Sequence, residues 1–167
     1  MNLFLLRHGI AAKRGTPGYE RDADRPLTPK GARRLERIAE AMDAMGLTYD
    51  LILSSPYVRA RQTAEILTSK LGLKEKLEFA KALTPDGDAK ALIAALKKLE
   101  PQPEGVLLVG HEPFLSELIS LLTSGDSHVG MDFKKGGLCK LEVEMLRHGR
   151  CATLAWLLTP WQMGLMG

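Results

Sequence analysis

The sequence is poor in cysteine and aromatic residues and has no long apolar run. Cysteine occurs twice, as Cys139 and Cys151, without the spacing of a metal-binding motif. A pair this sparse is more typical of buried thiols than of a disulfide, so we assign the cysteines no chemistry. The N-terminal apolar run, residues 3–6, is too short for a signal peptide or a membrane span, and no later run reaches spanning length. We therefore expect a cytoplasmic protein with no membrane contact.

Strong charge bias and low-complexity segments are missing as well. The formal net charge of +3 and the pI near 8.9 are compatible with acidic substrates, but the basic residues are too dispersed to indicate a nucleic-acid partner. With 45% hydrophobic and 26% charged residues, the composition is that of an ordinary globular chain. The length of 167 residues is close to that of one domain, so we expect a single domain over residues 1–167, present as a monomer.

Short apolar runs alternate with segments of helical periodicity along the chain. Strands are predicted over residues 3–6, 49–54, 77–80 and 105–110. Helices are predicted over residues 29–45, 56–71, 91–99 and 114–122. Residues 138–158 read as two strands around a turn, which is typical of an antiparallel hairpin. This order indicates the α/β class, as a three-layer α/β/α sandwich with a mainly parallel central sheet and a C-terminal antiparallel edge.

The residues that open the first two helices have a common pattern. Thr28-Pro29 and Ser55-Pro56 each place an N-cap residue before a proline at the first helical position. Ahead of Thr28, residues 10–27 form a loop with glycine and proline, and we expect residues 13–25 to act as a partial lid. The tail, residues 156–167, is expected to pack on the core.

Three polar motifs follow the predicted strands. Arg7-His8-Gly9 comes directly after the first strand, Arg59 lies near the start of the helix after the second strand, and His111 follows the strand at residues 105–110. Taken singly, each residue is more typical of a structural or surface position than of a catalyst. Ligands gather beyond the carboxyl ends of the strands in such sheets, so the convergence of all three motifs at one edge favours a functional site.

The residue types in this set suit phosphoryl transfer. A neutral imidazole at His8 is a competent nucleophile toward phosphorus, because its ordinary pKa of about 6.5 leaves a free lone pair at physiological pH. Arg7 and Arg59 can hold phosphoryl oxygens in forked hydrogen bonds, and a protonated His111 can donate to another oxygen. Gly9 removes a side chain where the backbone must approach the phosphate. This chemistry requires no metal and no cofactor.

These motifs resemble those of the histidine phosphatase superfamily, also called phosphoglycerate-mutase-like. Its Arg-His-Gly signature stands at residues 7–9, its Ser-x-x-x-Arg-Ala-x-x-Thr-Ala pattern at residues 55–64, and its later Gly-His element at residues 110–111. The resemblance extends from residue 1 to about residue 122 and implies a helix-flanked, mainly parallel sheet. It also implies that His8 is the nucleophile. The implied phosphate pocket consists of Arg7, Arg59 and His111.

Within this superfamily the chain is most similar to the short SixA-type phosphohistidine phosphatases, judging from its size and from residues 25–28 and 83–88. Larger members place a glutamate after the third strand as general acid, and no glutamate matches here. Asp86 and Asp88 are alternatives, although an Asp-Gly turn followed by a helix N-cap explains them more simply. A phosphohistidine needs such an acid less than a sugar phosphate does, because an imidazole leaving group is more easily protonated. The expected substrate and partner is therefore a phosphorylated protein that carries phosphohistidine.

Other functions fit some of the same residues. A small-molecule phosphomonoesterase, acting on sugar or nucleotide-precursor phosphates, would share the fold and the phosphate pocket. A catalytically silent phosphate-binding module would keep the arginines, but the presence of both His8 and His111 favours an enzyme. A metallohydrolase is disfavoured because no carboxylate or third histidine has ligand-like spacing. A second Arg-His-Gly, at residues 147–149, is predicted to lie in a turn away from the site.

Overall fold

A computed structural model describes residues 1–166, which form one mixed sheet with the strand order β3-β2-β4-β1-β5-β6. The strands are β1 (Asn2–Arg7), β2 (Leu51–Ser54), β3 (Leu77–Phe79), β4 (Gly105–Gly110), β5 (Leu138–Val143) and β6 (Ala152–Leu158). The pairs β1 with β4, β2 with β4 and β2 with β3 are parallel. β5 runs antiparallel to β1, and β6 antiparallel to β5. The prediction of a mainly parallel sheet with an antiparallel C-terminal edge is confirmed.

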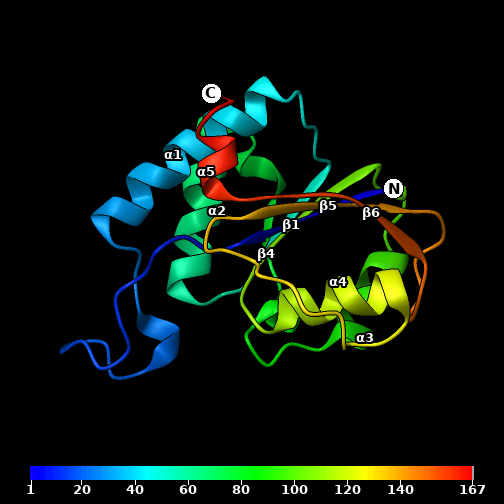
Figure 1. Ribbon diagram of the computed structural model, residues 1–167, viewed down its shortest axis with the longest axis horizontal. Helices are drawn as coiled ribbons and strands as arrows, with labels where there is room; N and C mark the ends of the chain where they lie inside the picture. Colours follow the sequence, from blue (N-terminus) through cyan, green and yellow to red (C-terminus); the bar gives the residue numbers. More distant parts are fainter. Residues whose placement is uncertain (167) are drawn as a thin grey trace.

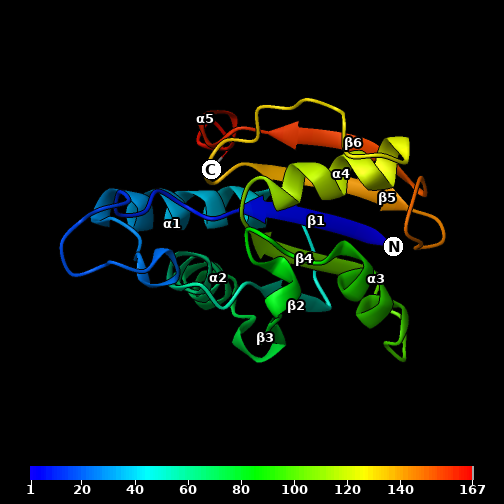
Figure 2. The same ribbon diagram turned by 90° about the horizontal axis from the view of Figure 1, so that it is seen from below.

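Helices cover both faces of this sheet (Figures 1 and 2). The α-helices are α1 (Pro29–Ala44), α2 (Val58–Leu71), α3 (Ala89–Lys97), α4 (Phe114–Ser124) and α5 (Pro160–Met163). The short 3-10 helices are η1 (Asp22–Asp24), η2 (Lys74–Lys76) and η3 (Lys81–Leu83). One face carries α1, α2 and α5, and the other carries α3 and α4 (Figure 1). The predicted three-layer α/β/α sandwich is thus present.

The two cores on either side of the sheet follow from the alternation of side chains along the strands. In β1, Leu3 and Leu5 belong to the core beneath α3 and α4, whereas Phe4 and Leu6 belong to the core beneath α1 and α2. Because both faces are covered, β1 and β4 read as continuous apolar runs rather than as an alternating pattern. Both central strands therefore end inside the molecule, and the residues that follow them are shielded from solvent.

The first helix begins as predicted, but the second does not. Thr28 caps α1, since its side chain accepts a hydrogen bond from the backbone N–H of Gly31 at 3.0 Å. The N-cap of α2 is Tyr57, without a side-chain cap, so the prediction that Ser55 caps this helix is wrong. The backbone N–H of Ser55 donates to the carbonyl of Val109 at 2.9 Å, which continues the pairing of β2 with β4 beyond the strand. The chain therefore turns into the helix later, and the Ser55 hydroxyl accepts from the backbone N–H of Tyr57 at 3.3 Å, ahead of the helix.

The C-terminal tail packs on the core only in part. Met163 is fully buried beside α1, and Trp156 is partly buried against the same core. Trp161 and Met166 are 69% and 45% exposed, so the expectation that the tail packs on the core is wrong for these two side chains. Gly167 lies outside the described residues. None of the helices formed by residues 1–166 has the length and apolar character needed to cross a membrane.

Candidate active site

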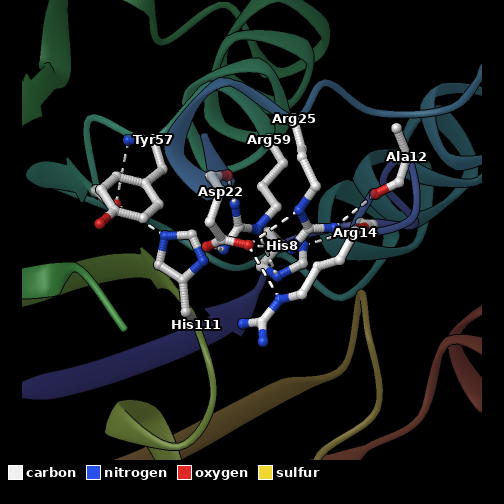
Figure 3. A network of polar contacts seen from close by, with 10 residues as sticks. His8, Ala12, Arg14, Asp22, Arg25, Tyr57, Arg59 and His111 are labelled. Carbon is white, nitrogen blue, oxygen red and sulfur yellow. Dashed lines mark hydrogen bonds and ion pairs between the residues drawn. The ribbon is translucent and has the colours of Figure 1, made fainter. Parts of the chain in front are cut away.

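The register of the parallel strands brings the predicted site residues to one edge of the sheet. Arg7 is paired with Gly110 in the register of β1 and β4, so His8 and His111 follow neighbouring strands in the same direction. Their ring centroids lie 5.0 Å apart. Arg59, in the first turn of α2, reaches the same place from the adjacent strand–helix connection, and Figure 3 shows its side chain beside His8.

The hydrogen bonds of His8 define its tautomer. Nδ1 lies 2.7 Å from the carbonyl oxygen of Gly9, and because a carbonyl can only accept, Nδ1 must carry the proton. Nε2 therefore holds the lone pair, which accepts a hydrogen bond from Nε of Arg59 at 3.2 Å. Burial, and then the neighbouring His111, lower the pKa of His8 well below its ordinary value. The ring is thus neutral at physiological pH, with its unprotonated nitrogen turned toward an arginine.

Arg59 is almost fully buried and is bound on several sides. Its side chain is 3% exposed, Nη1 donates to the backbone carbonyl of Asp22 at 2.7 Å, and Nη2 donates to Oδ2 of Asp22 at 2.9 Å. The centre of the guanidinium lies 5.3 Å from the ring centroid of Tyr57, within cation–π distance. A buried, fixed guanidinium of this kind is suited to binding a phosphoryl group.

His111 stands on the other side of His8 and is 1% exposed. Its Nε2 lies 2.8 Å from the hydroxyl of Ser55, and its ring meets the edge of Tyr57 at a centroid distance of 5.2 Å. Nδ1 is buried and has no hydrogen-bond partner among residues 1–166. Burial, and then the charge of Arg59, lower the pKa of His111 to about 3. The protein alone therefore favours the neutral ring over the protonated form that the sequence interpretation assigned, whereas the charge of a phosphate dianion would shift the equilibrium back toward protonation.

Arg7 is held by the segment that precedes β5. Its Nη1 donates to the carbonyl of Phe133 at 2.7 Å, and the backbone N–H of Gly136 donates to the carbonyl of Arg7 at 2.9 Å. Nε of Arg7 is buried and has no partner among the described residues. Unlike Arg59, this arginine has no hydrogen bond to His8 or to another residue of the predicted pocket, so its place beside the phosphate remains a prediction.

Gly9 packs closely against α1 and forms a backbone hydrogen bond to α2. Its backbone N–H donates to the hydroxyl of Thr63 at 3.1 Å. A Cβ atom at this position would lie 2.7 Å from Cδ1 of Leu35, so the buried side chain of Leu35 would have to shift to admit it. The contacts show that Gly9 also packs closely against α1, whereas the approach of the phosphate to its backbone stays a prediction.

Two residues of the site were not identified from the sequence. Thr63 accepts from Gly9 and donates to the carbonyl of Arg59 at 2.7 Å, which joins the two predicted motifs. Thr63 is part of the Ser-x-x-x-Arg-Ala-x-x-Thr-Ala pattern and lies one helical turn after Arg59, so its position in the sequence could have identified it. Asp22 had no such signal, because it lies in a loop and is separated from Arg59 by 37 residues.

A hollow of about 540 Å³ lies beside Asp22 and Tyr57, which contact Arg59 and His111. It is lined by Arg14, Gly15, Tyr19, Glu20, Asp22, Arg25, Tyr57, Pro85 and Asp86. The loop that was predicted to act as a partial lid therefore forms one wall of this hollow.

Of the two candidate acids, Asp88 caps α3 through the backbone N–H of Ala91, whereas Asp86 lies on the wall. Neither this hollow nor a larger one of about 850 Å³ between α1 and α2 is lined by His8, Arg59 or His111 themselves. We place the site at the smaller hollow, because Asp22 and Tyr57 on its wall contact Arg59 and His111.

The side chains around the two histidines do not form a metal-binding cluster among the described residues. Among residues 1–166, no group of three or more His, Cys, Asp or Glu side chains is arranged to hold a metal ion. The charges that face the two histidines come mainly from arginines, as expected for a site that binds an anion.

Comparisons with known proteins find relatives that cover most of the chain. Residues 3–84 match the family described as histidine phosphatase superfamily (branch 1). The phosphohistidine phosphatase SixA of Escherichia coli strain K12 is 31% identical over 128 residues, which cover 76% of this chain and 77% of that protein. An uncharacterized protein of Picosynechococcus sp. strain PCC 7002 is 41% identical over 142 residues, or 84% of each chain. The solved structure of the protein histidine phosphatase SixA complexed with tungstate has a TM-score of 0.82 at 28% identity, and the match covers 96% of this chain and 98% of that one.

Proposed function

This chain belongs to the histidine phosphatase superfamily, and from this premise we propose that it is a phosphatase that carries the phosphoryl group on His8 and removes it from phosphohistidine in a protein. The observation that carries the mechanism is the tautomer of His8. Its Nδ1–H is held by the carbonyl of Gly9, so that Nε2 presents a lone pair inside a buried, positively charged site.

The reaction proceeds in two transfers. Nε2 of His8 attacks phosphorus, the bond from phosphorus to the substrate's imidazole nitrogen breaks, and that imidazole leaves with a proton taken from solvent. A water molecule then attacks the phosphoryl group, and the bond from phosphorus to Nε2 breaks, which restores the lone pair of His8. One proton of the water stays on the inorganic phosphate, and the other is released to solvent. The hydrogen bond from Nδ1 to Gly9 stabilises the positive charge that the His8 ring acquires while it carries the phosphoryl group.

Arg59 and His111 act on the charge of the transferred group. Arg59 lies 3.2 Å from the attacking nitrogen and is fixed by Asp22, so its N–H groups need little reorganisation to meet the phosphoryl oxygens. The unpartnered, buried Nδ1 of His111 is available for hydrogen bonding to another oxygen. Donors of this kind typically contribute about 10²–10³-fold to the rate.

The choice of a phosphohistidine substrate rests on the leaving group. No glutamate was matched to the family's general acid, and Asp88, one of the two alternatives, is engaged in capping α3. An imidazole leaving group depends least on such an acid. The ring of Tyr57 contacts both His111 and Arg59 and lines the hollow, where a planar leaving group could stack. The likeness to SixA supports the same choice.

The test is a comparison of hydrolysis rates for a phosphohistidine peptide, para-nitrophenyl phosphate and a sugar phosphate, with wild type and His8→Ala, in the presence of a chelator. We expect the peptide to have the highest kcat/KM, His8→Ala to be inactive on all three, and acid-labile phosphate to be trapped on His8 of the wild type. A higher kcat/KM for the sugar phosphate would move the proposal to a small-molecule phosphomonoesterase. Phosphate binding by a wild type that turns over none of the substrates would indicate a silent binding module.

A further inference from the structure

Three arginines converge on the carboxylate of Asp22, beside the proposed nucleophile (Figure 3). Oδ1 of Asp22 accepts from Nε of Arg14 at 3.2 Å and from Nε and Nη2 of Arg25 at 3.0 and 2.7 Å. Oδ2 accepts from Arg59, as does the backbone carbonyl of Asp22. Burial raises the pKa of Asp22, but the hydrogen bonds from Arg25 and Arg59 outweigh it and lower the value to about 2. The residue is therefore a carboxylate at any physiological pH.

The hydrogen bonds of Arg59 show which of its edges Asp22 uses. A guanidinium has five N–H groups, of which Nε–H and one N–H of Nη2 lie along the same edge. In Arg59, Nε–H is directed to Nε2 of His8, whereas Nη1 and Nη2 each give one hydrogen bond to Asp22. Asp22 thus takes up the outer end of the guanidinium. The edge that faces His8 keeps a second N–H, which can meet an oxygen of a phosphoryl group bound to Nε2.

We propose that Asp22 is a positioning residue, which holds Arg59 so that its inner edge faces the nucleophile and the phosphoryl group. This inference rests on the proposed function of His8. The side chain of Arg59 is 3% exposed and has no other carboxylate within ion-pair distance among residues 1–166. Without the carboxylate of Asp22, Nη2 would be buried without its acceptor while Nη1 keeps only the backbone carbonyl, and the guanidinium would turn toward other partners. Asp22 also lies in η1, so the orientation of Arg59 depends on the docking of the loop that forms the wall of the hollow.

Asp22 could position Arg59 or compete with the substrate for it, and the two roles predict different effects of its removal on phosphate binding. If its carboxylate competed with the substrate for Arg59, its removal would free the arginine and phosphate would bind more tightly. If it positions Arg59, its removal leaves the arginine misdirected, and phosphate binding does not improve although a negative charge has been lost. The sign of the change in phosphate affinity therefore separates the two roles.

The experiment compares Asp22→Asn, Asp22→Glu and Asp24→Asn with the wild type. Asp24 provides a matched control, because it lies in the same 3-10 helix and its substitution removes the same charge, yet it pairs only with the exposed Arg21 at 3.5 Å. The measurements are kcat and KM for para-nitrophenyl phosphate, the Kd of inorganic phosphate by calorimetry, and thermal unfolding. Asp22→Glu keeps the negative charge but moves the carboxylate, so it provides a second test of the positioning role if Asp22→Asn does not fold.

We expect Asp22→Asn to lower kcat by about 10²-fold, as a displacement of a catalytic group by about 1 Å does. Its Kd for phosphate should be no lower than that of Asp24→Asn, Asp22→Glu should recover part of kcat, and Asp24→Asn should keep the wild-type kcat. Tighter phosphate binding by Asp22→Asn than by Asp24→Asn, or a wild-type kcat in Asp22→Asn or Asp22→Glu, would overturn the inference while leaving the proposed function intact. A wild type that neither hydrolyses the substrate nor binds phosphate would overturn both.

Discussion

The tripeptide Arg-His-Gly occurs at the end of the central strand β1 and again in the turn between β5 and β6, and the two copies have opposite surroundings. His8 is 5% exposed and is held between Gly9 and Arg59. His148 is exposed, and its neighbour Arg147 donates to the backbone carbonyl of Arg150 within the same turn. The first copy is surrounded by groups that come from distant parts of the chain, whereas the contacts of the second are local.

The glycines of the two copies are needed for different reasons. At Gly9 there is no room for a Cβ atom beside Leu35. At Gly149 there is nothing within 4 Å of such an atom, but the backbone φ of +135° is one that other residues rarely adopt. The same three letters therefore serve close packing in one place and a tight turn in the other. The comparison shows that only the copy at the end of a parallel strand is buried among polar groups from distant parts of the chain.

Exchange of each histidine for alanine tests this comparison most directly. His8→Ala should lower phosphatase activity by at least about 10³-fold, because the variant has no nucleophile to carry the phosphoryl group. His148→Ala should keep the wild-type rate. Initial rates with para-nitrophenyl phosphate and a phosphohistidine peptide provide the measurement. A comparable loss in both variants would show that the hairpin turn takes part in the reaction.

Arginine exchanges test whether geometry or charge matters at the site. Arg59→Lys keeps the positive charge but loses the guanidinium, whose inner edge faces His8 and whose outer end binds Asp22, so we expect kcat to fall by about 10²-fold. Arg61→Lys, on the exposed side of the same helix, is the control, because Arg61 only pairs with Glu65 at 3.7 Å. Steady-state kinetics on both variants show whether the geometry of Arg59 or only its charge is needed. Near-normal kcat in Arg59→Lys would mean that a point charge is sufficient.

The buried histidines should make the fold sensitive to acid. His111 has a folded pKa of about 3, whereas the ordinary value of about 6.5 applies in the unfolded chain. Below pH 6.5 the unfolded state therefore binds a proton that the folded state does not, and the free energy of unfolding falls by about 1.4 kcal/mol for each pH unit, down to the folded pKa. Denaturant titrations between pH 7.5 and 4.5 should show a smaller slope for His111→Asn than for the wild type. An unchanged slope in His111→Asn, or a reduced one in His148→Asn, would contradict this prediction.

The smallest effect is expected at the rim of the site, where Lys134 and Lys135 stand side by side before β5. Burial, and then the charges of Arg7, Arg25 and Arg59, lower the pKa of Lys135, whereas Lys134 forms an ion pair with Asp132. Of the two lysines, Lys135 is the one whose charge adds to that of the arginines at the pocket. Lys135→Ala should therefore raise KM by a few-fold with little change in kcat. Lys134→Ala should change neither constant. Equal KM values for the two variants would mean that the arginines alone provide the positive potential that attracts the substrate.

Much of this arrangement could be predicted from the sequence, because it depends on local patterns. The apolar run that became β4, the Thr28-Pro29 start of α1 and the hairpin of β5 and β6 were identified from periodicity and capping residues. The convergence of His8 and His111 followed from the rule that parallel strands end at a common edge. Ser55 was misassigned, since its residue type fits a helix cap and only its tertiary partner, His111, shows otherwise.

The sequence by itself therefore determined the class of fold, the order of its elements and the residue types that meet at the edge of the sheet, because these follow from hydrophobic periodicity and chain direction. The tertiary structure decided which nitrogen of His8 is free, that Thr63 links Gly9 to Arg59, and that Asp22 binds the outer end of that arginine. These features depend on hydrogen bonds between residues far apart in the chain. Their distances and directions are set by the packing of a loop and a helix against the sheet, which no local pattern encodes.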